Sequence, residues 1–230
     1  MLRYLVILIV LAGCSKKQPG TGSSLPPVYS TAKTYLALGD SYTIGQGVAA
    51  QDRFPAQTAA WLQQRGIKLD AVNYIATTGW PTTALQAAIN TQNPLPHTVV
   101  TLLIGVNDQY QVRDTTGYRQ RFTALLQKSI ELARGKKENV VVLSIPDYSV
   151  TPFAAGSGDT ARIRQEIDWF NAINKNVTQN YNVAYLDITP STREARNNPA
   201  LVASDGLHPS GLEYKKWAER LGPIFEAVLR

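Results

Sequence analysis

Short apolar runs that stop at a glycine, proline or aspartate recur along this chain. The strongest of them, residues 98–105, is almost continuously apolar, a pattern that suits a parallel strand covered on both faces. Four weaker runs also have the composition and the turn boundaries of buried strands. Strands are therefore predicted at residues 34–38, 69–76, 98–105, 139–145 and 183–188.

Between the predicted strands, apolar residues recur at the spacing of a helix with one buried face. Helices are predicted over residues 54–65, from residue 81, over 117–133 and 160–179, and from residue 212 with a bend at Pro223, while 42–51 and 204–210 are predicted as loops. Strands that alternate with helices are joined by right-handed crossovers and covered on both faces. The predicted fold class is α/β, a three-layer α/β/α sandwich around a five-stranded parallel sheet.

The composition agrees with one globular domain in a chain of 230 residues, of which 44% are apolar and 17% charged. The net charge of +6 does not indicate a particular binding partner, because the basic pairs at residues 16–17, 136–137 and 215–216 are scattered along the chain. No basic run interleaves with aromatic residues as a nucleic-acid-binding face requires, so nucleic acid is not expected as a partner.

The first residues have the anatomy of an export signal. Arg3 supplies a positive flank, and residues 5–12 form an apolar core that is too short to span a bilayer. The stretch Leu11-Ala12-Gly13-Cys14 resembles the lipobox of bacterial lipoproteins, which implies a signal peptide over 1–13 and a lipidated Cys14 with a flexible tether over 14–30. Residues 31–230 then form the folded domain. This resemblance predicts a protein held at the bacterial cell envelope by its lipid. An ordinary signal peptide and a short uncleaved anchor are the alternatives.

Three predicted strands end in residues that can take part in nucleophilic catalysis. Ser41, Gly79 and Asn107 follow the first three strands, and the carboxyl ends of parallel strands meet at one edge of a sheet. The hydroxyl of Ser41 needs a base, and only two histidines are present. His97 precedes a strand and so lies at the opposite edge, which leaves His208 as the candidate base.

Further polar groups complete this candidate site. Asp205, three residues before His208, can accept the other imidazole N–H and fix the tautomer. The backbone N–H groups of Ser41 and Gly79 and the side-chain amide of Asn107 can stabilise an oxyanion. Asp40 and Asp108 are expected to brace loops rather than to react. A zinc site lacks ligands, because Cys14 is the only cysteine, and no metal or cofactor is predicted.

The sequence resembles the SGNH hydrolases, also called the GDSL esterase/lipase family, over most of its length. The matching blocks are Gly39-Asp40-Ser41-Tyr42, Gly79, Gly105-Val106-Asn107-Asp108 and Asp205-Gly206-Leu207-His208, in that order. The resemblance implies a flavodoxin-like fold, a Ser41 nucleophile, an Asp205–His208 acid–base pair, and oxyanion donors on Ser41, Gly79 and Asn107.

The predicted function is therefore that of a serine esterase that forms an acyl-enzyme, similar to a lysophospholipase or a short-chain acyl esterase. A carbohydrate O-deacetylase and a non-catalytic surface lipoprotein that binds a glycan are the alternatives. The aromatic and apolar residues near the predicted strand ends either wall a substrate groove or cap the core. They are Tyr42, Ile44, Trp80, Tyr110, Tyr148 and Phe153. The oligomeric state cannot be read from the sequence.

Overall fold

Five parallel strands form a single sheet in the computed structural model, which describes residues 33–113 and 115–230. The strands are β1 (Tyr35–Gly39), β2 (Val72–Ala76), β3 (Val99–Leu103), β4 (Val140–Leu143) and β5 (Ala184–Leu186), in the order β2-β1-β3-β4-β5. Gly39 pairs with Ala76 on one side and Leu103 on the other, so the carboxyl ends of the first three strands are level. This level edge brings the residues that follow β1, β2 and β3 together.

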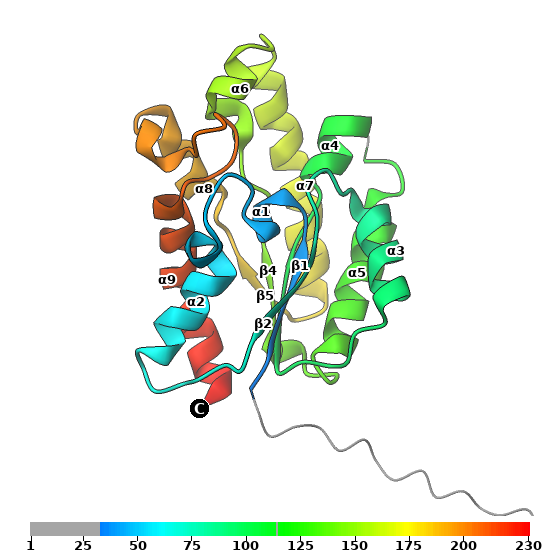
Figure 1. Ribbon diagram of the computed structural model, residues 1–230. Helices are drawn as coiled ribbons and strands as arrows, with labels where there is room; N and C mark the ends of the chain where they lie inside the picture. The colour runs from blue at the N-terminus through cyan, green and yellow to red at the C-terminus, as the bar shows by residue number, and fades with distance from the viewer. Residues whose placement is uncertain (1–32, 114) are drawn as a thin grey trace, which may run out of the picture. The chain divides into compact units, whose positions relative to one another are not determined.

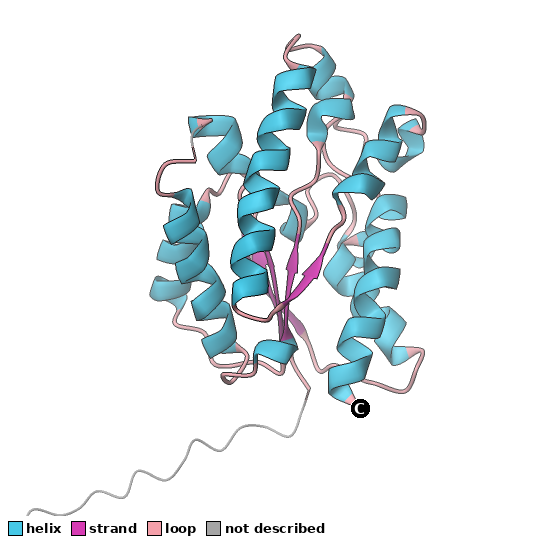
Figure 2. Ribbon diagram, turned by 180° about the vertical axis from the view of Figure 1, so that it is seen from behind, coloured by secondary structure: helices cyan, strands magenta, loops and turns pink. Residues whose placement is uncertain are grey.

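Helices cover both faces of the sheet (Figures 1 and 2). One layer consists of α2 and α9, which pack against each other, and the other contains α3, α5 and α7. The helices are α1 (Ser41–Ile44), α2 (Phe54–Gln63), α3 (Thr82–Gln92), α4 (Val106–Val112), α5 (Tyr118–Leu132), α6 (Pro152–Ala155), α7 (Thr160–Asn180), α8 (Thr189–Thr192) and α9 (Gly211–Leu229). The predicted three-layer sandwich with a five-stranded parallel sheet is confirmed, and its strand order is that of flavodoxin-like folds.

The two layers bury the sheet on both sides. Every residue of β1, β3 and β4 is buried, as the near-continuous apolar runs indicated. The two helices α2 and α9 approach closely at Gly222, where an added Cβ would collide with the Trp61 ring. Pro223 lies inside α9, which continues to Leu229. The rings of Phe225 in α9 and Tyr35 in β1 also lie edge to face, with their centroids 5.2 Å apart, so α9 is held against both α2 and β1.

Some element boundaries differ from the sequence-based predictions. The strand predicted at 69–76 begins only at Val72, and the loop predicted at 42–51 contains α1, which begins at Ser41. A helix of four residues has no apolar period to detect, and α1 forms because the Asp40 side chain caps it. Residues 106–112, 152–155 and 189–192 also form short helices that the apolar pattern did not predict.

The described residues belong to one compact unit, Thr31–Arg230. The predicted signal peptide, Cys14 and the tether lie outside the described residues. Within the described part of the chain, no helix is both long and apolar enough to cross a bilayer.

Candidate active site

Ser41 is held at the carboxyl end of β1 by a sharp turn into α1. Asp40 caps this helix, its Oδ1 accepting the backbone N–H of Tyr42 at 3.0 Å. A Cβ at Gly39 would collide with the carbonyl oxygen of Leu103 and with Thr43, so only glycine lets the chain pass this point without displacing its neighbours. As the first residue of α1, Ser41 has a backbone N–H that no helical hydrogen bond uses.

The carboxyl group of Asp40 is fully buried beside Ser41. Burial raises the pKa of Asp40 to about 8, although the N–H of Tyr42 works against this shift and the nearby charge of Asp108 adds to it. The second oxygen, Oδ2, is buried and has no hydrogen-bond partner among the described residues. Burial therefore disfavours the charged form of this carboxyl group beside Ser41.

His208 and Asp205 lie on one short loop before α9. The imidazole Nδ1 is 2.7 Å from Asp205 Oδ2, while Asp205 Oδ1 accepts the backbone N–H groups of Leu207 and His208 at 3.0 and 2.9 Å. Burial alone would raise the pKa of Asp205, but these two N–H groups and the imidazole outweigh it and lower the pKa below its usual value. Asp205 is therefore a carboxylate that can orient and charge-stabilise the imidazole ring.

The loop that carries this pair is closed on itself. The N–H of Ala203 donates to the carbonyl oxygen of His208 at 2.7 Å, and the N–H of Ser210 donates to that of Leu201 at 2.9 Å. An isolated antiparallel bridge joins Val202 and Pro209 between these two bonds. The mutual geometry of Asp205 and His208 is thus set within ten residues of chain.

Gly79 lies in a tight turn that follows β2. The N–H of Trp80 donates to the carbonyl oxygen of Thr77 at 3.3 Å, and Gly79 is the third residue of this turn with φ +84°. A positive φ at this position is the mark of a type II turn and favours glycine. A Cβ on Gly79 would meet no atom within 4 Å, so positive φ is the reason for the glycine here.

Asn107 lies in the first turn of α4, directly after β3. One N–H of its side-chain amide donates to the carbonyl oxygen of Trp80 at 3.1 Å. A primary amide has two N–H groups, so the second remains able to donate to a bound oxygen. Its neighbour Asp108 points elsewhere and accepts the Thr82 N–H at 2.8 Å and the Thr82 hydroxyl at 2.6 Å. Asp108 therefore braces the start of α3, as expected.

The structure brings Ser41, Gly79, Asn107 and His208 together around one cavity with a volume of about 150 Å³. Asp205 lies behind His208 and does not line it. Four of the six predicted groove residues line the cavity, namely Tyr42, Tyr110, Tyr148 and Phe153. Ile44 and Trp80 are absent from the lining; Trp80 packs against the core instead. Three further residues that were not predicted as site residues also line the cavity. Val106 and Leu207 lie within the blocks named above, and Thr78 precedes Gly79.

Three aromatic rings from different elements form the mouth of this cavity. The ring centroids of Tyr110, Tyr148 and Phe153 lie 6.2 to 6.4 Å apart. Tyr110 and Phe153 are 50% and 46% exposed. Tyr110 and Phe153 therefore present apolar surface to solvent at the cavity that Ser41 and His208 line, whereas Tyr148 is buried.

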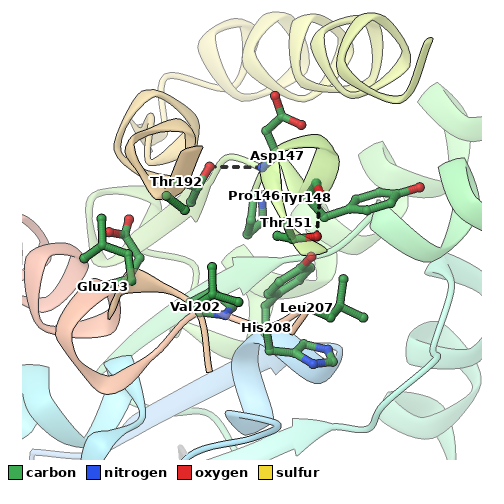
Figure 3. Close-up of a pocket in the computed structure, with 13 residues that line it drawn as sticks. Pro146, Asp147, Tyr148, Thr151, Thr192, Val202, Leu207, His208 and Glu213 are labelled. Carbon is green, nitrogen blue, oxygen red and sulfur yellow. Dashed lines mark hydrogen bonds between the residues drawn. The ribbon is translucent and has the colours of Figure 1, made fainter. Parts of the chain in front are cut away.

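A second, smaller hollow lies on the other side of Tyr42, with a volume of about 20 Å³. Figure 3 shows His208 and Leu207 on one side of this hollow and Glu213 on the other, with the Asp147 carboxylate directed away from it. A hollow of this size has room for about one water molecule. The cavity lined by Ser41 is therefore the one that could hold a substrate group.

His97 lies far from this cavity, as its position in the sequence predicted. It is buried before the amino end of β3, where its Nε2 is 2.8 Å from the amide nitrogen of Asn73. Among the described residues, no group of three or more His, Cys, Asp or Glu side chains is arranged to hold a metal ion.

The fold is a three-layer α/β sandwich with this cavity at the carboxyl edge of its sheet, and comparison with known families identifies the class. Residues 37–216 match the model of the GDSL-like lipase/acylhydrolase family. The chain therefore belongs to this family, and membership indicates an enzyme that hydrolyses esters. A search of curated proteins found no match.

Solved structures of low sequence identity share the fold. A member of the lipolytic G-D-S-L family from Veillonella parvula is 20% identical, with a TM-score of 0.63 over 85% of this chain and 99% of that one. The lipase/acylhydrolase from Enterococcus faecalis is 19% identical, with a TM-score of 0.63 over 85% and 95% of the two chains. The acetylxylan esterase Axe2 from Geobacillus stearothermophilus is 20% identical, with a TM-score of 0.60 over 86% and 94%.

Proposed function

We propose that this protein is a serine esterase in which Ser41 is the nucleophile and His208 the general base. The observation that carries the proposal is the shared cavity, in which Ser41 and His208 meet while Asp205 binds the far side of the imidazole. A hydroxyl and an imidazole that line one cavity, with a carboxylate bound to the far side of the imidazole, are the parts of a catalytic triad.

The proposed reaction runs through an acyl-enzyme. His208 takes the proton of the Ser41 hydroxyl as its oxygen attacks the ester carbonyl, and Asp205 stabilises the imidazolium that forms. The oxyanion accepts hydrogen bonds from the N–H groups of Ser41 and Gly79 and from the Asn107 amide. His208 then returns the proton to the departing alcohol, and water releases the acyl group by the same steps.

The cavity supports a small, uncharged acyl group as the substrate. Its volume of about 150 Å³ is below the range of roughly 300–1,000 Å³ that is usual for sites of drug-sized ligands. Apart from His208, its lining consists of apolar, aromatic and hydroxyl-bearing side chains and one amide. In a series of p-nitrophenyl esters, kcat/KM is expected to be highest for acetate to butyrate and to fall for longer chains. Equal rates up to palmitate would contradict this size limit.

Removal of an acetyl group from a glycan is a second candidate, because the half-exposed rings of Tyr110 and Phe153 could stack on sugar rings. The fold likeness to an acetylxylan esterase is compatible with this candidate. Release of acetate from acetylated xylan or from peptidoglycan, compared with p-nitrophenyl acetate, distinguishes the two. If none of these esters is cleaved, the result favours the third alternative, a non-catalytic surface lipoprotein that binds glycans or a partner.

The substitution Asn107→Ala is expected to lower kcat by roughly 10²–10³, as for other oxyanion-hole donors. In the wild type, the hydrogen bond from the Asn107 amide would strengthen as negative charge develops on the carbonyl oxygen of the ester. Asn73→Ala is the matched control, because Asn73 also uses its side-chain amide in one hydrogen bond but lies beside His97. Steady-state kinetics with p-nitrophenyl acetate measures both. Wild-type turnover in the Asn107 variant would remove this residue from the mechanism.

Activity is expected to fall as the pH is lowered, because a protonated imidazole cannot accept the Ser41 proton. Asp205 does not set this limit: its lowered pKa keeps it a carboxylate until more acidic pH is reached. The pH profile of kcat/KM should therefore show loss of one essential base on the acid side. A rate that stays constant well into acid would contradict the role of His208.

We also propose that Cys14 carries lipid and holds the protein at the cell envelope, on the basis of the lipobox-like stretch 11–14. A lipidated chain should incorporate labelled palmitate in a bacterial host and partition into detergent, because buried acyl chains contribute about 0.8 kcal/mol per CH₂. Cys14→Ser should abolish both. Equal labelling of this variant would contradict the proposal.

A further inference from the structure

The turn that carries Gly79 has little support of its own. It follows β2, which is an edge strand of the sheet, and its single internal hydrogen bond spans 3.3 Å. Within the described residues, no hydrogen bond uses the N–H of Gly79, and this residue lines the cavity with open space around its Cα. The direction of that N–H therefore depends on whatever holds the turn in place.

Two side chains of α4 hold this turn from the same side. Gln111 Nε2 donates to the carbonyl oxygen of Gly79 at 2.9 Å, and Asn107 donates to the carbonyl oxygen of Trp80 at 3.1 Å. These residues are four positions apart and so project from one face of the helix. The carbonyl groups of two consecutive turn residues, Gly79 and Trp80, therefore accept hydrogen bonds from α4. This helix follows β3, which is the central strand of the sheet.

We propose that Gln111 is a positioning residue for catalysis. By holding the Gly79 carbonyl, it keeps the turn in the conformation that directs the Gly79 N–H into the cavity. Gln111 does not line the cavity, so it acts through Gly79 and not by contact with a substrate. This inference rests on the proposed role of Gly79 as an oxyanion donor. None of the family-like blocks in the sequence includes residue 111, and its side chain is exposed, so the contact with Gly79 is what points to the role.

Replacing Gln111 should lower kcat, but by less than the loss of the Gly79 N–H as an oxyanion donor would. Removing an oxyanion donor lowers kcat by roughly 10²–10³. A turn without Gln111 keeps its contact with Asn107 and the hydrogen bond from the Thr78 hydroxyl to Gln46 Oε1 at 2.9 Å. It therefore still samples the productive conformation for part of the time, which places the expected loss at about tenfold. The loss should appear in kcat and not in KM, because the oxyanion exists only after attack on the carbonyl.

The test uses two substitutions at residue 111 and one control. Gln111→Glu keeps the side-chain size but replaces the donor by an oxygen that repels the Gly79 carbonyl. Gln111→Lys keeps a donor at the end of a flexible chain. The control is Gln127→Glu, because Gln127 is also exposed on a helix and donates to a single oxygen, the Tyr181 hydroxyl, at 2.6 Å. Each variant is measured for kcat, KM, Tm and inhibition by an alkylboronic acid, which forms a tetrahedral adduct with a serine nucleophile.

For Gln111→Glu, kcat and the affinity for the boronic acid should both fall by about tenfold, while KM and Tm stay unchanged. Gln111→Lys should keep most of the wild-type kcat and most of the affinity for the boronic acid. Gln127→Glu should equal the wild type in both. The inference is overturned if Gln111→Glu retains wild-type kcat and inhibition, or if only its KM or Tm changes. Ser41→Ala separates this outcome from failure of the proposed function: an inactive Ser41 variant beside an unaffected Gln111 variant rejects the positioning role alone, whereas an active Ser41 variant rejects the esterase mechanism itself.

Discussion

Replacing Ser41 by alanine should lower kcat for p-nitrophenyl acetate by about 10⁶, the order of loss when the nucleophile of a serine protease is removed. The substitution deletes one oxygen at a site that is 5% exposed, and the Asp40 cap on the Tyr42 N–H needs no group from Ser41. The fold is therefore expected to persist, so that loss of activity reports chemistry. Steady-state kinetics and thermal unfolding of the same preparation measure the two separately.

Ser129→Ala provides the matched control for this substitution. Ser129 is also buried, and its hydroxyl donates to the carbonyl oxygen of Leu125 at 2.8 Å within α5. Removing the Ser129 hydroxyl should change Tm slightly and leave kcat unchanged. If Ser41→Ala retained more than about a hundredth of wild-type turnover, far above the residual rate expected without a nucleophile, another group would have to attack the ester.

Replacing Asp205 by asparagine should lower kcat by about 10⁴, the loss seen when the orienting aspartate of a triad becomes an amide. The amide oxygen would stay on the N–H groups of Leu207 and His208, which Oδ1 now accepts. Its NH₂ group would then face Nδ1 of His208 in place of the carboxylate oxygen at 2.7 Å. Nδ1 would become an acceptor, the proton would move to Nε2, and His208 could no longer take the Ser41 proton.

Asp168→Asn is the control for the loss of one carboxylate. Asp168 is exposed and binds Arg193 at 2.6 Å, away from the cavity lining, and a surface ion pair of this kind contributes about 0–1 kcal/mol to stability. Its kinetics should equal those of the wild type. A loss of less than about tenfold in Asp205→Asn, against the 10⁴ expected for the orienting group of a triad, would show that another group orients the imidazole.

The fold was predictable because the strong strands have clear ends. The run at 98–105 is almost continuously apolar and stops at Gly105, and in the structure β3 is buried on both faces. The weaker run at 69–76 lies at the sheet edge, where partial exposure blurs the apolar pattern, and its strand begins three residues later than predicted. Short helices such as α1 depend on a single cap, which no periodicity reveals.

The candidate site was predictable where its groups are close in sequence or follow a strand directly. Asp205 and His208 meet because they are three positions apart in one turn, and Ser41 and Asn107 follow β1 and β3. Other features depend on tertiary packing between distant elements. The sequence could not decide which aromatic side chains enter the cavity, and Ile44 and Trp80 do not. The contact of Gln111 with Gly79 joins residues 32 positions apart and has no local signal.

The closed loop that carries Asp205 and His208 divides the proposed machinery between two parts of the chain. Ser41, Gly79 and Asn107 all precede the loop, whereas the complete acid–base pair lies on the loop and is held by bonds between residues 201 and 210. These parts are joined by the packing of α9 on α2 and by hydrogen bonds from the Phe153 N–H to the Gly206 carbonyl oxygen and from Gln57 Nε2 to that of Gly211. A chain interrupted in the exposed stretch 196–200 would therefore yield one fragment with the nucleophile and another with the base. Neither fragment could turn over ester alone, and recovered hydrolysis in a mixture would report their reassembly.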